Sequence, residues 1–157
     1  MEAGSTYFAG QFGVVPFDVN HDVPTFGFVV QHPFMGILAF ITDSYNMDFY
    51  LNNIDHWLIE ANYDDRILKA NVADGKIDRA QANRLMLSHM SLDNTIHYLR
   101  ECGVGGCDTT AKTITLCHLS ERNSCPKMFA DRVAGEFGIP TQVAAKGVVV
   151  NLNKDVI

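Results

Sequence analysis

The sequence lacks the features that mark membrane proteins, secreted proteins and proteins that coat nucleic acid. No stretch approaches the about 18 apolar residues that cross a bilayer. The first residues, Met1 to Ser5, contain neither a basic segment nor an apolar one, so no signal peptide is visible. Basic residues are the minority, 12 against 18 acidic ones, and the net charge of −6 argues against a broad nucleic-acid surface. We therefore expect a cytoplasmic protein with no membrane partner.

What is present is an ordinary globular composition. The chain has 157 residues, of which 47% are hydrophobic and 19% charged, which suits one domain with a real core. An acidic balance still permits a nuclease, because bound metal ions supply positive charge where the phosphate lies.

Four cysteines, Cys102, Cys107, Cys117 and Cys125, raise the question of a structural zinc site. Their spacing is not one of the standard zinc-ribbon patterns. We therefore interpret them as reduced cysteines, one or two of them buried as small apolar residues.

Apolar periodicity and turn residues predict strands first and then helices that alternate with strands. Such an order favours an α/β fold with one mixed sheet and a helical layer. Ser91 is placed to cap the third helix, and Pro16 suits a sheet edge. The expected strands are Gln11–Val19, Thr25–Gln31, Ile37–Thr42, His56–Glu60 and Lys112–Cys117, with a closing hairpin over Gln142–Ala145 and Gly147–Leu152. The expected helices are Tyr63–Ala73, Arg79–Leu87, Leu92–Cys102 and Pro126–Gly138.

Polar residues that bind metals follow three of the apolar strands. They lie within the segments 17–22, 40–44 and 115–123. A strand end is a rigid mount, and imidazole with carboxylate suits zinc or manganese. Taken singly, each has a plainer explanation, a hydrogen-bonded histidine or an aspartate in a turn. His32, His56 and His97 match no such pattern, and we interpret them as surface or packing residues.

Taken together, order and spacing resemble the later metal motifs of the metallo-β-lactamase superfamily. The resemblance runs from Glu2 to Leu152 and is nearest to the nuclease-like branch around the WalJ/YycJ group and its phage-borne relatives, with RNase Z more distant. The motifs that carry it are Phe17-Asp18-Val19-Asn20-His21-Asp22, Thr42-Asp43-Ser44, Ile59-Glu60-Ala61-Asn62, Ser88-His89-Met90-Ser91 and His118-Leu119-Ser120-Glu121-Arg122-Asn123.

The resemblance implies a two-metal hydrolase that cleaves phosphodiesters of DNA or RNA, with two divalent ions, zinc or manganese, as cofactors. It makes His21 and His118 metal ligands and Asp43 the ligand that bridges both ions. It makes Glu60 the residue that orients His89, whose imidazolium protonates the leaving oxygen. The plainer alternative for His89 is a residue beside a helix that bonds only to backbone.

Ser120 and Asn123 follow the last expected ligand in a loop that leads into a helix. Such a loop offers backbone N–H groups and short polar side chains to a substrate phosphate. The alternative, which we prefer for Asn123 or Ser124, is the N-cap of that helix, with Pro126 in its first turn.

The superfamily's defining His-x-His-x-Asp-His segment, which supplies most of the metal ligands, has no counterpart here, and no histidine precedes His21. We therefore expect residues 1–157 to be the C-terminal half of the αββα sandwich, with poor metal occupancy and an exposed apolar sheet face. Its expected partners are a nucleic-acid substrate and either an N-terminal half-domain or a second copy. The alternative function is an inactive subunit that associates through the open sheet face. A third option keeps the fold and changes the substrate to a lactam or thioester.

Overall fold

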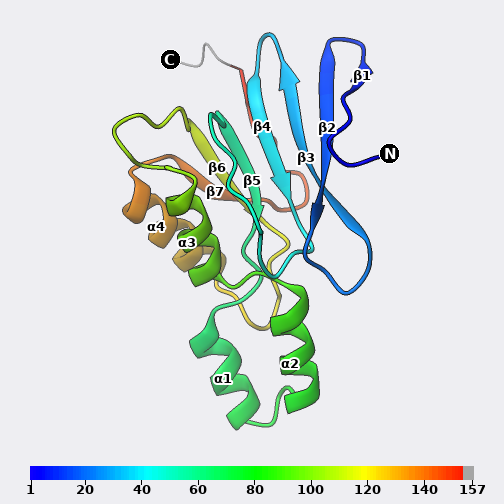
Figure 1. Cartoon of the computed structure of the whole chain (residues 1–157). Coiled ribbons are helices and arrows are strands. Elements are labelled where there is room, and N and C mark those ends of the chain that lie inside the picture. The colour runs from blue at the N-terminus through cyan, green and yellow to red at the C-terminus, as the bar shows by residue number, and fades with distance from the viewer. Residues whose placement is uncertain (154–157) are drawn as a thin grey trace.

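The structure, a computed structural model that describes residues 1–153, contains one seven-stranded sheet and four helices (Figure 1). The strands lie side by side in chain order; β1 to β4 are antiparallel and β4 to β7 parallel. The predicted mixed α/β sheet is confirmed. The strands are β1 (Tyr7–Ala9), β2 (Phe12–Val19), β3 (Thr25–His32), β4 (Gly36–Ile41), β5 (His56–Glu60), β6 (Thr113–Cys117) and β7 (Thr141–Val143). The helices are α1 (Asp65–Ala73), α2 (Arg79–Ser88), α3 (Leu92–Glu101) and α4 (Pro126–Phe137).

The main core lies between one face of the sheet and helices α3 and α4, which Figure 1 shows on the same side of the sheet. Side chains alternate between the two faces of a strand, so every second residue of β4, β5 and β6 points into this core. Ser91 caps α3 as predicted, because its side chain accepts a hydrogen bond from the Asn94 N–H. The core side chains from the sheet include Ala39, Ile41, Trp57, Ile59, Ile114 and Leu116, and the helices add Leu99, Phe129 and Val133.

The opposite face of the sheet is apolar and has no helical cover in residues 1–153. The strand registers place Phe28, Phe40 and Leu58 in one row on this face, and all three are half-buried. The rings of Phe28 and Phe40 stack with their centroids 6.4 Å apart. An apolar face of this kind is one against which a second sheet could pack.

Helices α1 and α2 form a hairpin that projects beyond the sheet (Figure 1). The hairpin has a small core of its own, built on Tyr63, Leu68, Ile77 and Ala82. The side chains of Asp64 and Asp78 accept hydrogen bonds from the first turns of α1 and α2, which fixes where each helix begins. Of the helices in the described part of the chain, none is long and apolar enough to cross a membrane.

Two sequence expectations about the sheet fail. Strand β1 was not predicted, because a segment of three residues is too short to show the alternation of apolar and polar side chains that marks a strand. The closing hairpin is wrong: only β7 forms, and it pairs in parallel with β6. A turn at Gly147, where φ is 85°, follows β7, and Val149 beyond it is 91% exposed. The β-branched residues of this segment predicted a strand. A strand also needs a neighbouring strand with which to pair, and residue type alone does not predict that neighbour.

Candidate functional site

The predicted site residues meet at the carboxyl edge of the sheet. Strands β4, β5 and β6 run in parallel, so the residues at or just beyond their ends, Asp43, Glu60 and His118, share one edge. Strand β2 runs in the same direction, because two antiparallel pairings separate it from β4, and His21 follows its end. His89 reaches the same place from the C-terminal end of α2. The structure therefore brings all five predicted residues together.

Two of these residues have an unusual backbone. Asp43 has a φ of 54° and His118 a φ of 56°, in the left-handed region that non-glycine residues rarely occupy. Among the described non-glycine residues, Asn53 alone shares this feature. Such strain persists where the surrounding structure determines the conformation, and it gathers at functional sites. Here it turns the chain sharply at the ends of β4 and β6.

Glu60 is the centre of the site and is completely buried. Its Oε1 accepts hydrogen bonds from Nδ1 of His89 at 2.7 Å and from Nδ1 of His118 at 2.9 Å. The backbone N–H of Ser44 donates to Oε2 at 3.0 Å. Burial alone would raise the pKa of Glu60, but these three hydrogen bonds outweigh it and hold the pKa below its ordinary value. Glu60 is therefore an ionised carboxylate that orients two imidazole rings.

The hydrogen bonds to Glu60 also settle which ring nitrogens are free. A carboxylate only accepts, so Nδ1 of His89 and of His118 must carry hydrogen, and Nε2 of each ring is left for another partner. The bond to Glu60 raises the pKa of His118, and the nearby Asp43 carboxylate, whose Oδ1 lies 3.7 Å from His118 Nδ1, acts in the same direction. The site thus favours positive charge at its exposed side.

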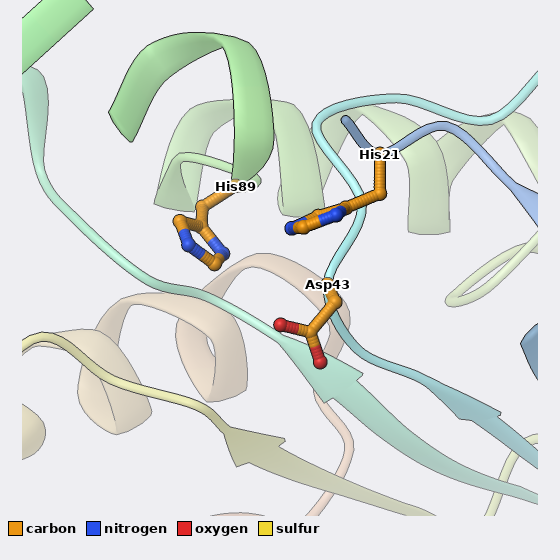
Figure 2. Close-up of side chains that lie close together, drawn as sticks. All are labelled: His21, Asp43 and His89. Atoms are coloured by element: carbon orange, nitrogen blue, oxygen red, sulfur yellow. The ribbon is translucent and has the colours of Figure 1, made fainter. Parts of the chain in front are cut away.

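Two groups of three side chains have the geometry to hold a metal ion. Ligand atoms of His21, Asp43 and His89 all lie within 4.8 Å of one another, as do those of Glu60, His89 and His118 (Figure 2 shows the first group). Two imidazoles and a carboxylate suit zinc, manganese or iron, so the residues fit a divalent ion. The sequence grouped His118 with His21 and Asp43, whereas the structure places His89 beside them, with the His21 and His89 ring centroids 5.7 Å apart. No cysteine belongs to either group.

Two buried polar side chains that had no predicted role, Asn62 and Thr95, hold the site in place. Asn62 Nδ2 donates to the carbonyl of His118 at 2.6 Å, and its backbone N–H donates to the carbonyl of Met90 at 2.8 Å. Thr95 Oγ1 in α3 donates to the carbonyl of Glu60 at 2.7 Å. Asn62 could have been predicted from the sequence, because it is the last residue of the motif Ile59-Glu60-Ala61-Asn62 at the end of β5. Thr95 gave no signal, because it reaches Glu60 only through the packing of α3 on the sheet.

The loop after His118 is fixed by an asparagine network. Asn123 is only 2% exposed; its Oδ1 accepts from Asn71 Nδ2 at 2.9 Å and its Nδ2 donates to Ser120 Oγ at 3.2 Å. The predicted N-cap is wrong, since Cys125 holds that position without a side-chain cap, although Pro126 begins the helix as expected. Buried in this way, Asn123 holds the loop. A substrate contact from the half-buried Ser120 stays a prediction.

An open cavity of about 460 Å³ lies over the histidines, and α2 forms its wall. The α2 residues that line it include Gln81, Arg84 and Leu85. Arg84 was not predicted as a site residue, and its guanidinium lies 3.5 Å from the carboxylate of Asp22. The site therefore has an arginine beside the metal-binding groups.

No protein-family model matches the chain, and no curated protein matches it in sequence. Solved structures do match its fold. The metallo-β-lactamase fold protein YhfI from Bacillus subtilis superposes with a TM-score of 0.69 at 16% identity, covering 94% of this chain and 53% of YhfI. Human tRNase Z, short form, gives 0.54 at 19% identity, covering 93% of this chain and 45% of that protein. CmlA, a diiron β-hydroxylase from Streptomyces venezuelae, gives 0.52 at 10% identity, covering 90% of this chain and 32% of CmlA. The chain thus has a metallo-β-lactamase fold and spans about half the length of YhfI.

Proposed function

We propose that this chain carries the carboxyl-edge half of the active site of a metal-dependent hydrolase that cleaves phosphodiesters of nucleic acid. The observation that carries the proposal is the completely buried Glu60 carboxylate, which holds His89 and His118 at 2.7 and 2.9 Å beside His21 and Asp43. Hydrogen-bonded imidazoles next to a metal-ligand set suit hydrolysis better than simple binding. The tRNase Z among the structural neighbours supports nucleic acid as the substrate class.

In this proposal His21, Asp43 and His118 would hold divalent ions, zinc or manganese, and Asp43 would be the shared ligand. Ions bound here would supply Lewis-acid stabilisation of the negative charge that develops on the phosphate. Asp43 and His118 are 39% and 42% exposed, so both reach the cavity where a substrate would lie. The unusual backbone at both residues holds them at that edge.

His89 is the proposed proton donor. Its Nδ1 is committed to Glu60, so Nε2 is the nitrogen that can present a proton to the leaving oxygen. Glu60 fixes the orientation of the His89 ring through this hydrogen bond and is therefore a positioning residue. Protonation matters because an alkoxide is a poor leaving group near neutral pH.

We also propose that a His-x-His-x-Asp-His segment from outside this chain completes the ligand set. The solved neighbours are about twice as long as the part that this chain matches. The apolar face with Phe28, Phe40 and Leu58 is where a second sheet would pack and bury them. A separately made polypeptide that carries such a segment should bind this chain and raise its metal content.

The test compares His89→Ala with His21→Ala in the complex of the chain with that polypeptide. Metal content after dialysis is measured by mass spectrometry, and cleavage is followed on a labelled oligonucleotide. We expect His21→Ala to lose metal and His89→Ala to keep it while cleaving about a hundredfold more slowly. Since His89 lies within ligand distance of His21 and Asp43, loss of metal from His89→Ala would make it a ligand and refute its role as the acid.

The open sheet face favours a second candidate function, that of an inactive subunit that acts by association. Its half-buried row of phenylalanine and leucine side chains is the specific observation behind it. Light scattering and binding of an apolar dye decide between the two. A chain that self-associates, binds no metal with the added polypeptide and cleaves nothing would establish the second candidate.

A further inference from the structure

Helix α2 presents two different faces. Gln81, Arg84, Leu85 and Ser88, at spacings of three and four residues, line the cavity over the histidines. Residues at such spacings lie on one stripe of a helix. A second stripe, Arg79, Ala82, Asn83 and Met86, lines a hollow against α1 instead. Only the first stripe therefore belongs to the candidate site.

The cavity over the histidines continues along α2. A neighbouring hollow of about 420 Å³ shares Gln81 and Leu85 with it and ends at Ser120 and Arg122, in the loop after β6. We name the two together the α2 groove. From Arg79 to Ser88 the helix rises about 14 Å at 1.5 Å per residue, which sets the approximate length of the groove.

Two arginines, Arg84 and Arg122, line the α2 groove together with the acidic Asp22, Asp43 and Glu121. The Arg84 side chain is 81% exposed, and the ion pair that it forms within residues 1–153, with Asp22 at 3.5 Å, is long enough to yield to a stronger anion. Arg122 is exposed near the other end, and its carbonyl is tied to α1 by Asn71 Nδ2 at 2.8 Å. An arginine fork matches the oxygens of a phosphate.

We propose that the α2 groove binds single-stranded nucleic acid, with Arg84 and Arg122 contacting phosphates that flank the one at the histidines. This rests on the proposed function for the position of the cleaved phosphate. Hollows of this volume suit single nucleotides. The sparse positive charge suits a short stretch of backbone, since a long one would need many basic residues.

The experiment measures fluorescence anisotropy of a labelled twelve-nucleotide oligothymidylate with the full chain in EDTA, at low and moderate salt. Arg84→Ala and Arg122→Ala should each weaken binding about fivefold and reduce the salt dependence by about one phosphate contact. Arg79→Ala is the matched control, because it removes the same charge from the other stripe of α2. It should leave binding unchanged, and the lysine variants of Arg84 and Arg122 should recover part of the loss.

The possible outcomes separate this proposal from the proposed function. If Arg79→Ala weakened binding equally, the loss would reflect the overall charge of the chain, and the proposal that the α2 groove binds nucleic acid would be refuted. No binding by the unaltered chain at low salt, or tighter binding of a poly-glutamate competitor than of the oligonucleotide, would overturn it too. Binding that depends on Arg84 and Arg122, without cleavage after metal and the partner polypeptide are added, would have a different meaning. It would support nucleic-acid binding by the α2 groove and refute the proposed hydrolase activity.

Discussion

Replacing Glu60 by glutamine keeps the shape of the side chain and removes its charge. Every neighbour of the Glu60 carboxylate donates a hydrogen bond to it: Ser44 to one oxygen and both histidines to the other. Glutamine would offer these neighbours one oxygen, which accepts, and one NH₂, which donates. If the NH₂ turns toward Ser44 it faces a backbone N–H, and if it turns toward the histidines both rings must give up the hydrogen on Nδ1. Glu60→Gln should therefore destabilise the fold itself, apart from any effect on activity.

The magnitude follows from burial. Removing one partner of a fully buried ion pair costs about 3–5 kcal/mol. The side chains of His118 and His89 are 42% and 23% exposed, so water screens and partly satisfies them. Discounting for that screening, we expect Glu60→Gln to lower the free energy of unfolding by about 2 kcal/mol.

The loss should depend on pH. The pKa of Glu60 is lowered, so its stabilisation is present above its unfolded value of 4.5 and disappears as pH falls through the lowered pKa. The pKa of His118 is raised, so its stabilisation is complete below 6.5 and disappears as pH rises through the raised pKa. Both conditions hold between about pH 5 and pH 6.5. The cost of Glu60→Gln should be greatest there and clearly smaller at pH 9.

Urea unfolding in EDTA, followed by the fluorescence of Trp57, measures this directly. Trp57 is the single tryptophan and is 2% exposed, so its emission reports loss of the core. The exposed Glu101 provides the control, since Glu101→Gln should change stability by less than about 0.5 kcal/mol. A loss in Glu60→Gln no larger than the control, or one equal at pH 6 and pH 9, would refute the argument.

Three further predictions test the surroundings of the site. Gly27→Ala should lower the free energy of unfolding by about 1–3 kcal/mol, because a Cβ there would overlap the buried ring of Phe17 on the neighbouring strand. Asn62→Asp should cost about 2 kcal/mol in the same urea assay, because a carboxylate would face the carbonyl that Asn62 now donates to. Burial raises the pKa of Cys117 to about 12, so iodoacetamide at pH 8 should modify the exposed Cys125 long before Cys117, as followed by mass spectrometry.

Each of these has a matched control in the chain. Gly13→Ala, on the next strand, should be mild, because its Cβ would meet the ring of Phe8 at an ordinary 3.6 Å. Asn52→Asp is an exposed equivalent of Asn62→Asp and should leave stability unchanged. Exposed Cys107 should react like Cys125. Equal costs for both glycine variants, equal costs for both asparagine variants, or a fast Cys117 would count against the packing described for the site.

The sequence predicted elements whose signals are local. The Ser91 cap, the apolar periods of the helices and the β-branched runs of the central strands were visible within a few residues of chain. The site residues were also accessible, because the ends of parallel strands meet at one edge of a sheet and Asp43, Glu60 and His118 lie at or just beyond such ends. Strand ends drew attention to the segments that contain His21, Asp43 and His118, whereas Glu60 and His89 were assigned only from the resemblance to the metallo-β-lactamase superfamily.

Long-range contacts were not accessible in the same way. Asn71 gave no sign that it would hold the loop at Asn123, because the two are joined only through the docking of α1 against that loop. Arg84 looked like any exposed helical arginine until the structure showed which stripe of α2 faces the histidines. Helical spacing predicts that two stripes exist, and only tertiary packing decides which one borders the site.

The most consequential feature that no local motif contains is the sharing of one carboxylate oxygen. Oε1 of Glu60 accepts from both His89 and His118, and the two rings lie with centroids 5.0 Å apart. Both rings are therefore oriented by the same oxygen, so a displacement of one ring disturbs the hydrogen bond of the other. Removal of the His118 imidazole, as in His118→Ala, would leave this oxygen to His89 alone. By this route, events at the proposed metal ligands would adjust the proposed acid through a single buried oxygen.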